Sequence, residues 1–208
     1  MSTKIGIFSD PHATPGPVEE AFSIFRQQQV DHILCAGDIA GYGEDLDQTV
    51  ALVRQAECQA VIGNHESWCL EQMAEELDQT TCEYLGGLPT CLEMQVEGRT
   101  LYMVHASPPD SLMDGIRLLD EQGRLIEANL NCWAERLQGF EYDLLVVGHT
   151  HQVFAQRIAK TLVINPGSTL FNHSCVIVTL PDLHVEWYGL SDQAVRRSWN
   201  WGMMATGP

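Results

Sequence analysis

Two helix-like segments alternate with three short runs rich in Ile and Val over the first third of the chain. In order, these stretches are Lys4–Phe8, Pro17–Gln29, His32–Cys35, Glu44–Glu57 and Ala60–Ile62. Apolar residues in the first segment recur at positions 18, 21, 22 and 25, which is the spacing of one helix face. Because strands that alternate with helices usually pair in parallel, we expect three neighbouring parallel strands here.

The rest of the chain changes character after a polar helical stretch. The expected elements are a helix at Ser67–Leu77, a hairpin of Cys91–Val96 and Thr100–Val104, a loop at Ser107–Arg124, a helix at Leu125–Leu137, a strand at Asp143–Val147 and three or four strands between Val153 and Gly189. This order predicts an α/β sandwich of two sheets with helices outside. Because no repeat, low-complexity segment or linker interrupts the chain, we expect residues 1–208 to form a single domain.

Polar side chains gather at the points where these strands end. The residues in question are Asp10, His12, Asp38, Asn64, His65, His105, His149 and His151. Ligands of open α/β sheets bind in the crevice outside the carboxyl ends of the strands. We therefore expect these side chains to meet at one edge of the structure.

The residue types at this edge are those that bind divalent cations. Each motif alone is weak, because Asp-x-His, Gly-Asn-His and single histidines also occur in turns and cores. Together, carboxylates, imidazoles and one amide oxygen suit Mn, Fe, Zn, Ni or Co rather than copper(I) or an iron–sulfur cluster. Asp38, central in the series, is the natural bridge between two cations, and a pair about 3.5–4 Å apart can clamp a phosphate. The sequence thus predicts two divalent metal ions, with manganese as the first choice.

The ordered motifs resemble those of the calcineurin-like metallophosphoesterase superfamily. They are Asp10-x-His12, Gly37-Asp38, Gly63-Asn64-His65-Glu66, His105 and Gly148-His149-x-His151, and Asn165–Ser168 is similar to a stretch of the small bacterial and archaeal, phosphodiesterase-like members. The resemblance implies an α/β fold, a four-layer α-β-β-α sandwich of two mixed sheets flanked by helices. It also implies a hydrolase that cleaves phosphodiesters or phosphomonoesters of small molecules by attack of a dimetal-bound hydroxide.

The same resemblance implies a role for each of the strand-end residues. The first metal would be held by Asp10, His12, Asp38 and His151, and the second by Asp38, Asn64, His105 and His149. His65 would be catalytic and not a ligand. In the family pattern this histidine faces the phosphate, where it protonates the leaving oxygen or stabilises its charge.

Two positions depart from the pattern of the protein phosphatases and the symmetrical dinucleoside tetraphosphatases of this superfamily. Those enzymes carry an Asp-Arg pair three and four residues after the bridging Asp, where this chain has Gly41 and Tyr42. The Arg is a bidentate phosphate clamp, and the Asp is the usual partner of the motif histidine. Their replacement argues against protein phosphatase activity and favours small diesters.

The net charge limits the classes of partner. A formal charge of −17 argues against nucleic-acid binding, which relies on Lys and Arg gathered on one face. A nuclease therefore stays only as an alternative. Two divalent cations add about +4 to the site itself, so an acidic protein can still bind a small phosphorylated substrate. The other alternative is a catalytically idle scaffold that binds a protein partner, but such members lose ligands or the histidine of Gly-Asn-His, and this chain keeps them all.

Cysteine usage and apolar patterning indicate the compartment. The seven cysteines are scattered without a CxxC pair, which is typical of reduced and mostly packed thiols in a cytoplasmic protein. The chain starts without a secretory pattern, and the apolar run Leu144–Gly148 is too short to span a bilayer. The oligomeric state is left open. Trp187, Trp199 and Trp201 either cover a dimer contact or, as we favour, pack onto the chain's own sheet.

Overall fold

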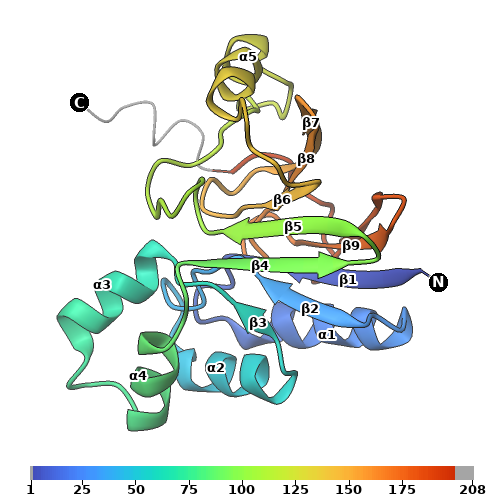
Figure 1. Cartoon of the computed structure of the whole chain (residues 1–208). Coiled ribbons are helices and arrows are strands. Elements are labelled where there is room, and N and C mark those ends of the chain that lie inside the picture. Colours follow the sequence, from blue (N-terminus) through green and yellow to red (C-terminus); the bar gives the residue numbers. More distant parts are fainter. Residues whose placement is uncertain (1, 200–208) are drawn as a thin grey trace.

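The computed structural model describes residues 2–199, in which ten strands form two five-stranded sheets. The strands are β1 (Thr3–Phe8), β2 (His32–Cys35), β3 (Gln59–Ala60), β4 (Cys91–Val96), β5 (Arg99–Val104), β6 (Leu144–Val146), β7 (Val153–Ile158), β8 (Thr161–Pro166), β9 (Ser174–Leu180) and β10 (His184–Gly189). The helices are α1 (Pro15–Gln27), α2 (Leu46–Gln55), α3 (Asn64–Met73), α4 (Gln79–Gly86) and α5 (Glu127–Arg136). Figure 1 shows how these elements are arranged.

Both sheets are mixed, as predicted. The first has the order β10-β9-β1-β2-β3, in which β1, β2 and β3 are parallel and β9 and β10 are antiparallel additions. The second has the order β4-β5-β6-β8-β7, in which β5, β6 and β8 are parallel and the two outer strands are antiparallel. Each sheet therefore contributes three parallel strands, and the carboxyl ends of those strands carry the predicted site.

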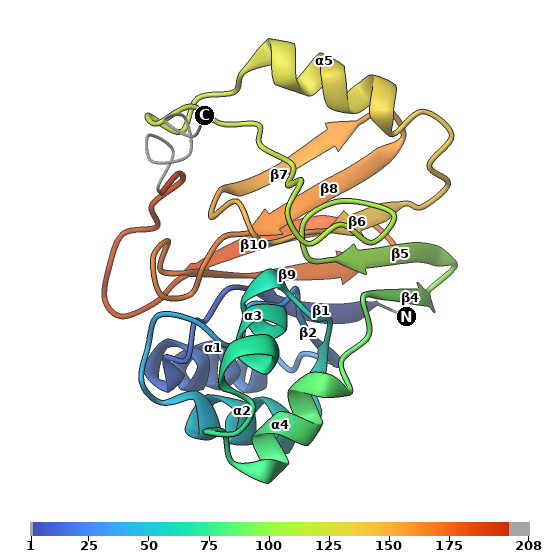
Figure 2. The same cartoon turned by 90° about the vertical axis from the view of Figure 1, so that its left-hand side faces the viewer.

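Alternating side chains divide the core into three apolar layers. Ile5, Ile7 and Leu34 of the first sheet meet Leu101 and Met103 of the second in the layer between the sheets. The opposite face of the first sheet packs against α1 and α2, and the opposite face of the second packs against α5. Figure 2 shows the two sheets with α5 on one side and α1 to α4 on the other. The architecture is the expected α-β-β-α sandwich.

One helix differs from its predicted bounds by more than two residues, and another was not predicted, each for a local reason. The helix expected at Ser67–Leu77 begins three residues earlier, at Asn64, because the Glu66 carboxylate accepts the backbone N–H of Gly63 at 2.6 Å and so satisfies a free donor of the first turn. Helix α4 was not predicted. It is short and polar, and its N-terminus is capped by Asp78, whose side chain accepts the Thr80 N–H at 2.8 Å.

The remaining general expectations have mixed outcomes. All seven cysteines are free, and five of them lie in or pack against the apolar layers (Cys35, Cys58, Cys69, Cys91 and Cys175), so the expected packing of most thiols is confirmed, whereas Cys132 is exposed. Within residues 2–199, none of the helices has the length and apolar character needed to cross a membrane. That the whole chain forms one domain stays a prediction.

The tryptophans of the last third pack within the chain where the structure describes them. Trp187 in β10 contacts the apolar layer between the sheets. Trp199 stacks on Phe171, with ring centroids 3.8 Å apart and an interplanar angle of 6°. Trp201 lies outside the described residues.

Candidate metal centre and active site

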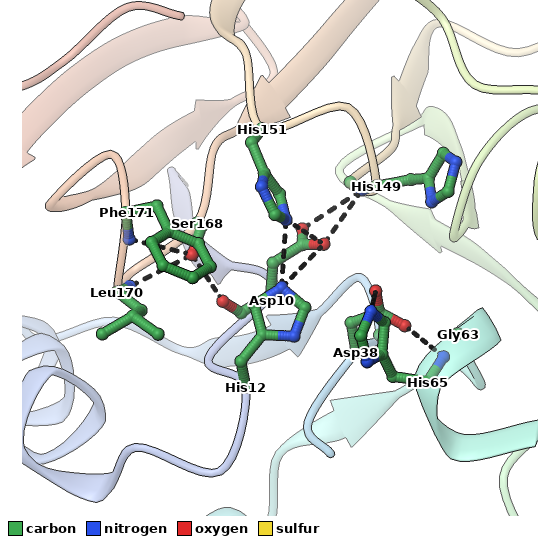
Figure 3. A network of polar contacts seen from close by, with 12 residues as sticks. Asp10, His12, Asp38, Gly63, His65, His149, His151, Ser168, Leu170 and Phe171 are labelled. Carbon is green, nitrogen blue, oxygen red and sulfur yellow. Dashed lines mark hydrogen bonds and ion pairs between the residues drawn. The ribbon is translucent and has the colours of Figure 1, made fainter. Parts of the chain in front are cut away.

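The structure brings one group of predicted ligands together at the end of β1. Asp10 and His12 follow β1, His151 follows β6, and all three side chains are buried. The Nε2 atoms of His12 and His151 lie 3.0 Å apart, and His151 Nε2 lies 3.3 Å from Asp10 Oδ1. In Figure 3 the two imidazoles point toward each other beside the Asp10 carboxylate. Two nitrogens bound at about 2.1 Å to one ion, at an angle of 90–110°, would lie about 3.0–3.4 Å apart.

A second group forms around the side chain of Asn64. His105 Nε2 lies 3.1 Å from Asn64 Oδ1 and 3.3 Å from Asp38 Oδ2. His149 Nδ1 lies 2.9 Å from the same Asn64 oxygen. These side chains come from the ends of β2, β3, β5 and β6, so four parallel strands supply the group.

Asp38 lies between the two groups. Its carboxylate is within 4.8 Å of ligand atoms of His12 and His65 on one side and of His105 and His149 on the other. It is 2% exposed and also accepts the backbone N–H of His65 at 2.9 Å through Oδ1. This carboxylate therefore stabilises the N-terminus of α3 while its other oxygen faces the site.

In three of the histidines, one ring nitrogen lies within hydrogen-bonding distance of a backbone carbonyl oxygen. His12 Nδ1 is 3.2 Å from the Ala40 oxygen, and His105 Nδ1 is 2.7 Å from the Ala36 oxygen. His149 Nε2 is 3.0 Å from the Met113 oxygen. A carbonyl only accepts, so each of these nitrogens carries a proton, and the other ring nitrogen is directed into the site, where a cation can take the place of its proton. This is the usual orientation of metal-ligating histidines.

The electrostatics of the second group favour a cation. Burial alone would lower the pKa of His105, but the charge of Asp38 outweighs it and raises this pKa to about 10. A positive charge is thus stabilised where His105 Nε2 faces the Asp38 and Asn64 oxygens. Burial lowers the pKa of His149 to about 4, so the His149 ring is neutral and can act as a ligand.

The pKa shifts of the first group also favour the binding of a cation. Burial lowers the pKa of His12 to about 4, which keeps this imidazole neutral. Burial raises the pKa of Asp10, but the hydrogen bond and charge of His151 outweigh that effect and leave it well below its ordinary value. An ionised carboxylate beside a neutral imidazole is the donor set that a divalent cation requires.

The backbone at this edge is held in an uncommon conformation. Positive φ angles occur at Asp10 (52°), His12 (48°), Asp38 (54°), His149 (65°) and His151 (48°). Non-glycine residues in the left-handed region cost on the order of 1–3 kcal/mol each and gather at functional sites. Five of the seven predicted ligands share this conformation, which indicates that their side-chain directions are maintained at the expense of stability.

His65 lies beside the ligand groups, with a ring nitrogen within 4.8 Å of ligand atoms of His12 and Asp38, so the geometry also allows it to join them. Its Nε2 is 3.9 Å from Asp38 Oδ2, and its ring contacts those of His12, Tyr42 and Trp68 at centroid distances of 4.7, 4.9 and 5.0 Å. Burial lowers the pKa of His65, which favours the neutral ring. A neutral imidazole still has one N–H to donate.

Gly41 and Tyr42 stand at the two sequence positions of the Asp-Arg pair, and their surroundings show what replaces it. Gly41 has φ +145°, and a Cβ on it would overlap the ring of His12, so the present backbone cannot accommodate an aspartate. Tyr42 lays its ring against His12, at 4.7 Å between centroids, and against Phe171 at 5.6 Å. An aromatic side chain therefore occupies the place of the phosphate-clamping arginine.

Sequence reasoning missed the role of Glu66. This buried carboxylate accepts backbone N–H groups from Asp38 at 2.9 Å, Ala40 at 2.6 Å and Gly63 at 2.6 Å. Burial raises the pKa of Glu66 to about 7, reinforced by Asp38 and opposed by the N–H donors. It joins the loop after β2 to the loop after β3. A Glu at the third position of a helix, next to His65, was the available signal.

The end of β8 and the segment that follows it hold the backbone of the first ligand group through hydrogen bonds. Ser168 Oγ donates to the Asp10 carbonyl at 2.6 Å and accepts the N–H groups of Leu170 and Phe171, both at 3.1 Å. Asn165 Nδ2 donates to the Gly148 carbonyl at 2.8 Å. The Asn165–Ser168 motif thus ties the ends of β1, β6 and β8 together, as Figure 3 shows for Ser168.

Aromatic residues with no motif of their own cover the first group. Phe171 and Trp199, stacked on each other, each lie 5.4 Å from the His151 ring between centroids. The backbone N–H of Trp199 donates to the His151 carbonyl at 3.2 Å. These contacts limit solvent access to His151 from one side.

Two groups of carboxylate, imidazole and amide donors around one shared aspartate define a candidate centre for a pair of divalent cations. The model of the calcineurin-like phosphoesterase superfamily domain matches residues 3–181, and the chain belongs to this superfamily.

Relatives and solved structures agree with this membership. An uncharacterised protein of Methanocaldococcus jannaschii is 24% identical over 186 residues, which cover 80% of this chain and 70% of that protein. A metallophosphoesterase from Sphaerobacter thermophilus has the same fold, with a TM-score of 0.69, 24% identity, and coverage of 92% of this chain and 89% of that one. A structure described as a novel archaeal phosphodiesterase gives a TM-score of 0.59, 17% identity, and coverage of 90% and 100%.

Proposed function

We propose that this protein is a metal-dependent phosphoesterase acting on small phosphodiesters or phosphomonoesters. The observation that carries the proposal is the set of three imidazoles that each place one ring nitrogen on a backbone carbonyl and turn the other toward Asp10, Asp38 or Asn64. Membership of the phosphoesterase superfamily supports it, and so does the fold shared with an archaeal protein described as a phosphodiesterase.

The donor geometry supports the following division of ligands. The first cation would be held by Asp10, His12, Asp38 and His151, and the second by Asp38, Asn64, His105 and His149. Manganese is the first choice among Mn, Fe, Zn, Ni and Co, all of which suit these ligands. Two such cations, when bound, supply an activated water and neutralise the charge on the phosphate.

His65 would act on the leaving oxygen of the substrate. The water oxygen forms a new bond to phosphorus, the bond from phosphorus to the alcohol oxygen breaks, and the alcohol leaves with one proton. The resemblance implies that His65 is not a ligand, and its Nε2 lies 3.9 Å from Asp38 Oδ2, so its ring can face a phosphate bound beside Asp38. As a neutral ring it would donate a hydrogen bond from its N–H to the departing oxygen and stabilise the charge that develops there, and the proton that leaves with the alcohol would come from the attacking water.

The alternatives fit the site less well. A catalytically idle scaffold would not need seven buried or half-buried donor side chains, five of which belong to residues with positive φ angles. A nuclease would need a basic surface, whereas the formal charge of this chain is −17.

A hydrolysis screen tests the proposal directly. Protein reconstituted with Mn is assayed against panels of small monoesters and diesters, with Asp38→Asn assayed in parallel. Hydrolysis by the wild type that falls at least about 100-fold in Asp38→Asn is expected. No hydrolysis of any ester by protein that holds two metal equivalents would refute the proposal.

A further inference from the structure

A groove opens beside His65, between the loop after β2 and helix α3. It has a volume of about 340 Å³, near the lower end of the range for small-molecule pockets. Its walls are formed by Ala13, Gly41, Gly43, Glu44, Leu46, His65, Trp68, Cys69, Gln72 and Met73. His65 is the one residue of the predicted site among these lining residues, and none of the predicted metal ligands is among them.

One face of α3 forms a whole wall of the groove. His65, Trp68 and Gln72 are three and four residues apart, which places them in a row along a helix surface. The Trp68 ring is 5.0 Å from the His65 ring between centroids, and its side chain is 42% exposed. A group bound in the groove would thus contact Trp68 directly after His65.

The opposite wall of the groove is formed by the loop after β2. Gly43 packs so tightly on the backbone of His12 and Ala13 that a Cβ at this position would overlap it. The loop therefore lies close to the floor of the groove, and it adds Leu46 as a further apolar contact. The exposed indole of Trp68 on the other wall offers a flat surface on which a planar group can stack.

The chemistry of the walls excludes an anionic occupant. Among residues 2–199, no Lys or Arg lines the groove, and its one charged side chain is the acidic Glu44. A second phosphate placed there would meet a carboxylate without a compensating cation. Trp68 and Met73, which are 42% and 46% exposed, offer apolar surface instead.

We propose that this groove is the subsite for the leaving group of the substrate and that Trp68 selects a planar aromatic leaving group carrying no phosphate. This inference rests on the proposed phosphoesterase function. The assignment to the leaving side follows from His65, because the residue that would serve the departing oxygen is also the one residue of the predicted site that lines the groove. The alcohol released when the bond from phosphorus breaks would remain stacked on Trp68 until it diffuses away.

The test compares two diesters whose leaving groups have similar acidity but different ring area. Methyl phenyl phosphate and methyl 2-naphthyl phosphate are hydrolysed by the Mn-loaded wild type and by Trp68→Ala, Trp68→Phe and Leu125→Ala. Leu125 is 41% exposed and lies outside the groove, so its variant is the matched control. Metal content and thermal unfolding are measured for each protein.

The wild type should prefer the naphthyl ester. Trp68→Ala should lower kcat/KM for this ester by about tenfold and for the phenyl ester by less than about threefold, because the larger ring loses more stacking area. Trp68→Phe should restore most of the difference, and Leu125→Ala should match the wild type. Metal content should be the same in all four proteins.

Three outcomes would overturn the inference. One is an equal change for both esters in Trp68→Ala, or none. Another is faster turnover of diadenosine tetraphosphate, whose leaving group carries phosphate, than of the naphthyl ester. The third separates the two proposals: if wild-type protein with two metal equivalents hydrolyses neither ester nor any other phosphate ester, the phosphoesterase function itself is refuted and the subsite with it.

Discussion

The carboxylate of Glu66 accepts a hydrogen bond from the backbone N–H of Asp38 at 2.9 Å, although the two residues belong to loops that follow different strands. The same carboxylate accepts the N–H groups of Ala40 and Gly63. Glu66 thereby fixes the spacing between the shared aspartate and the N-terminus of α3, which carries Asn64 and His65. The position of the predicted bridging ligand depends on a residue that touches no other ligand side chain.

Replacing Glu66 with Gln tests this dependence. The amide has one acceptor oxygen, so its NH2 group would face a backbone N–H that Glu66 now satisfies, and a buried unpaired donor costs about 1–3 kcal/mol. We expect the free energy of unfolding to fall by about that amount and manganese affinity to fall by about 10–100-fold. Urea unfolding and metal titration measure the two effects.

The matched control for Glu66 is Glu71→Gln on the same helix, where the side chain is exposed. It should match the wild type in both measurements. Unchanged stability and affinity in Glu66→Gln would mean that the carboxylate does not hold the loops together.

His65→Ala should separate catalysis from metal binding. Each proposed cation keeps its four ligands without His65, so metal content should stay near that of the wild type, even though a ring nitrogen of His65 lies within 4.8 Å of ligand atoms of His12 and Asp38. Turnover of esters with poor leaving groups should fall by roughly 10²–10⁴, whereas an activated aryl ester, whose leaving oxygen hardly needs a proton, should suffer much less. The measurement is the ratio of mutant to wild-type kcat across a leaving-group series.

Two results would contradict the role that is proposed for His65. Loss of a metal equivalent in the variant would make this residue a ligand. An equal fall for all leaving groups would replace help to the leaving oxygen by charge stabilisation of the phosphate.

The Gly41–Tyr42 pair predicts the substrate class. An aromatic ring stands where other superfamily members carry a phosphate-clamping arginine, and Gly41 leaves no room for the aspartate. At equal metal loading, kcat/KM should be higher for an activated small diester than for a phosphoserine peptide. A clear preference for the peptide would contradict the assignment to the diesterase-like branch.

The strand ends could be predicted because they follow from local pattern. Short Ile- and Val-rich runs locate β1 and β2, and the residues after parallel strands must share an edge, so Asp10 and Asp38 come together by topology. The mixed character of the two sheets and the α-β-β-α order of the layers could also be predicted. Helix α4 was not, because it is short and polar and its cap at Asp78 gives little signal.

The supporting residues could not be predicted because their roles depend on loop geometry. Phe171 and Trp199 cover His151 from segments with no chemistry-bearing motif. The groove beside Trp68 depends on how closely the loop at Gly43 approaches Ala13, which no periodicity encodes. The motifs along the chain indicate which residues are ligands, whereas the orientation of three imidazoles depends on the carbonyls of Ala36, Ala40 and Met113, which only the folded loops bring into place.

Metal stoichiometry tests the central claim most directly. Protein purified without chelator and titrated with manganese should bind close to two equivalents by elemental analysis. Asp38→Asn should lose occupancy at both positions, because this carboxylate lies within reach of both ligand groups, whereas the exposed Asp182→Asn should bind as the wild type does. Fewer than one equivalent in the wild type after titration would contradict a dinuclear centre.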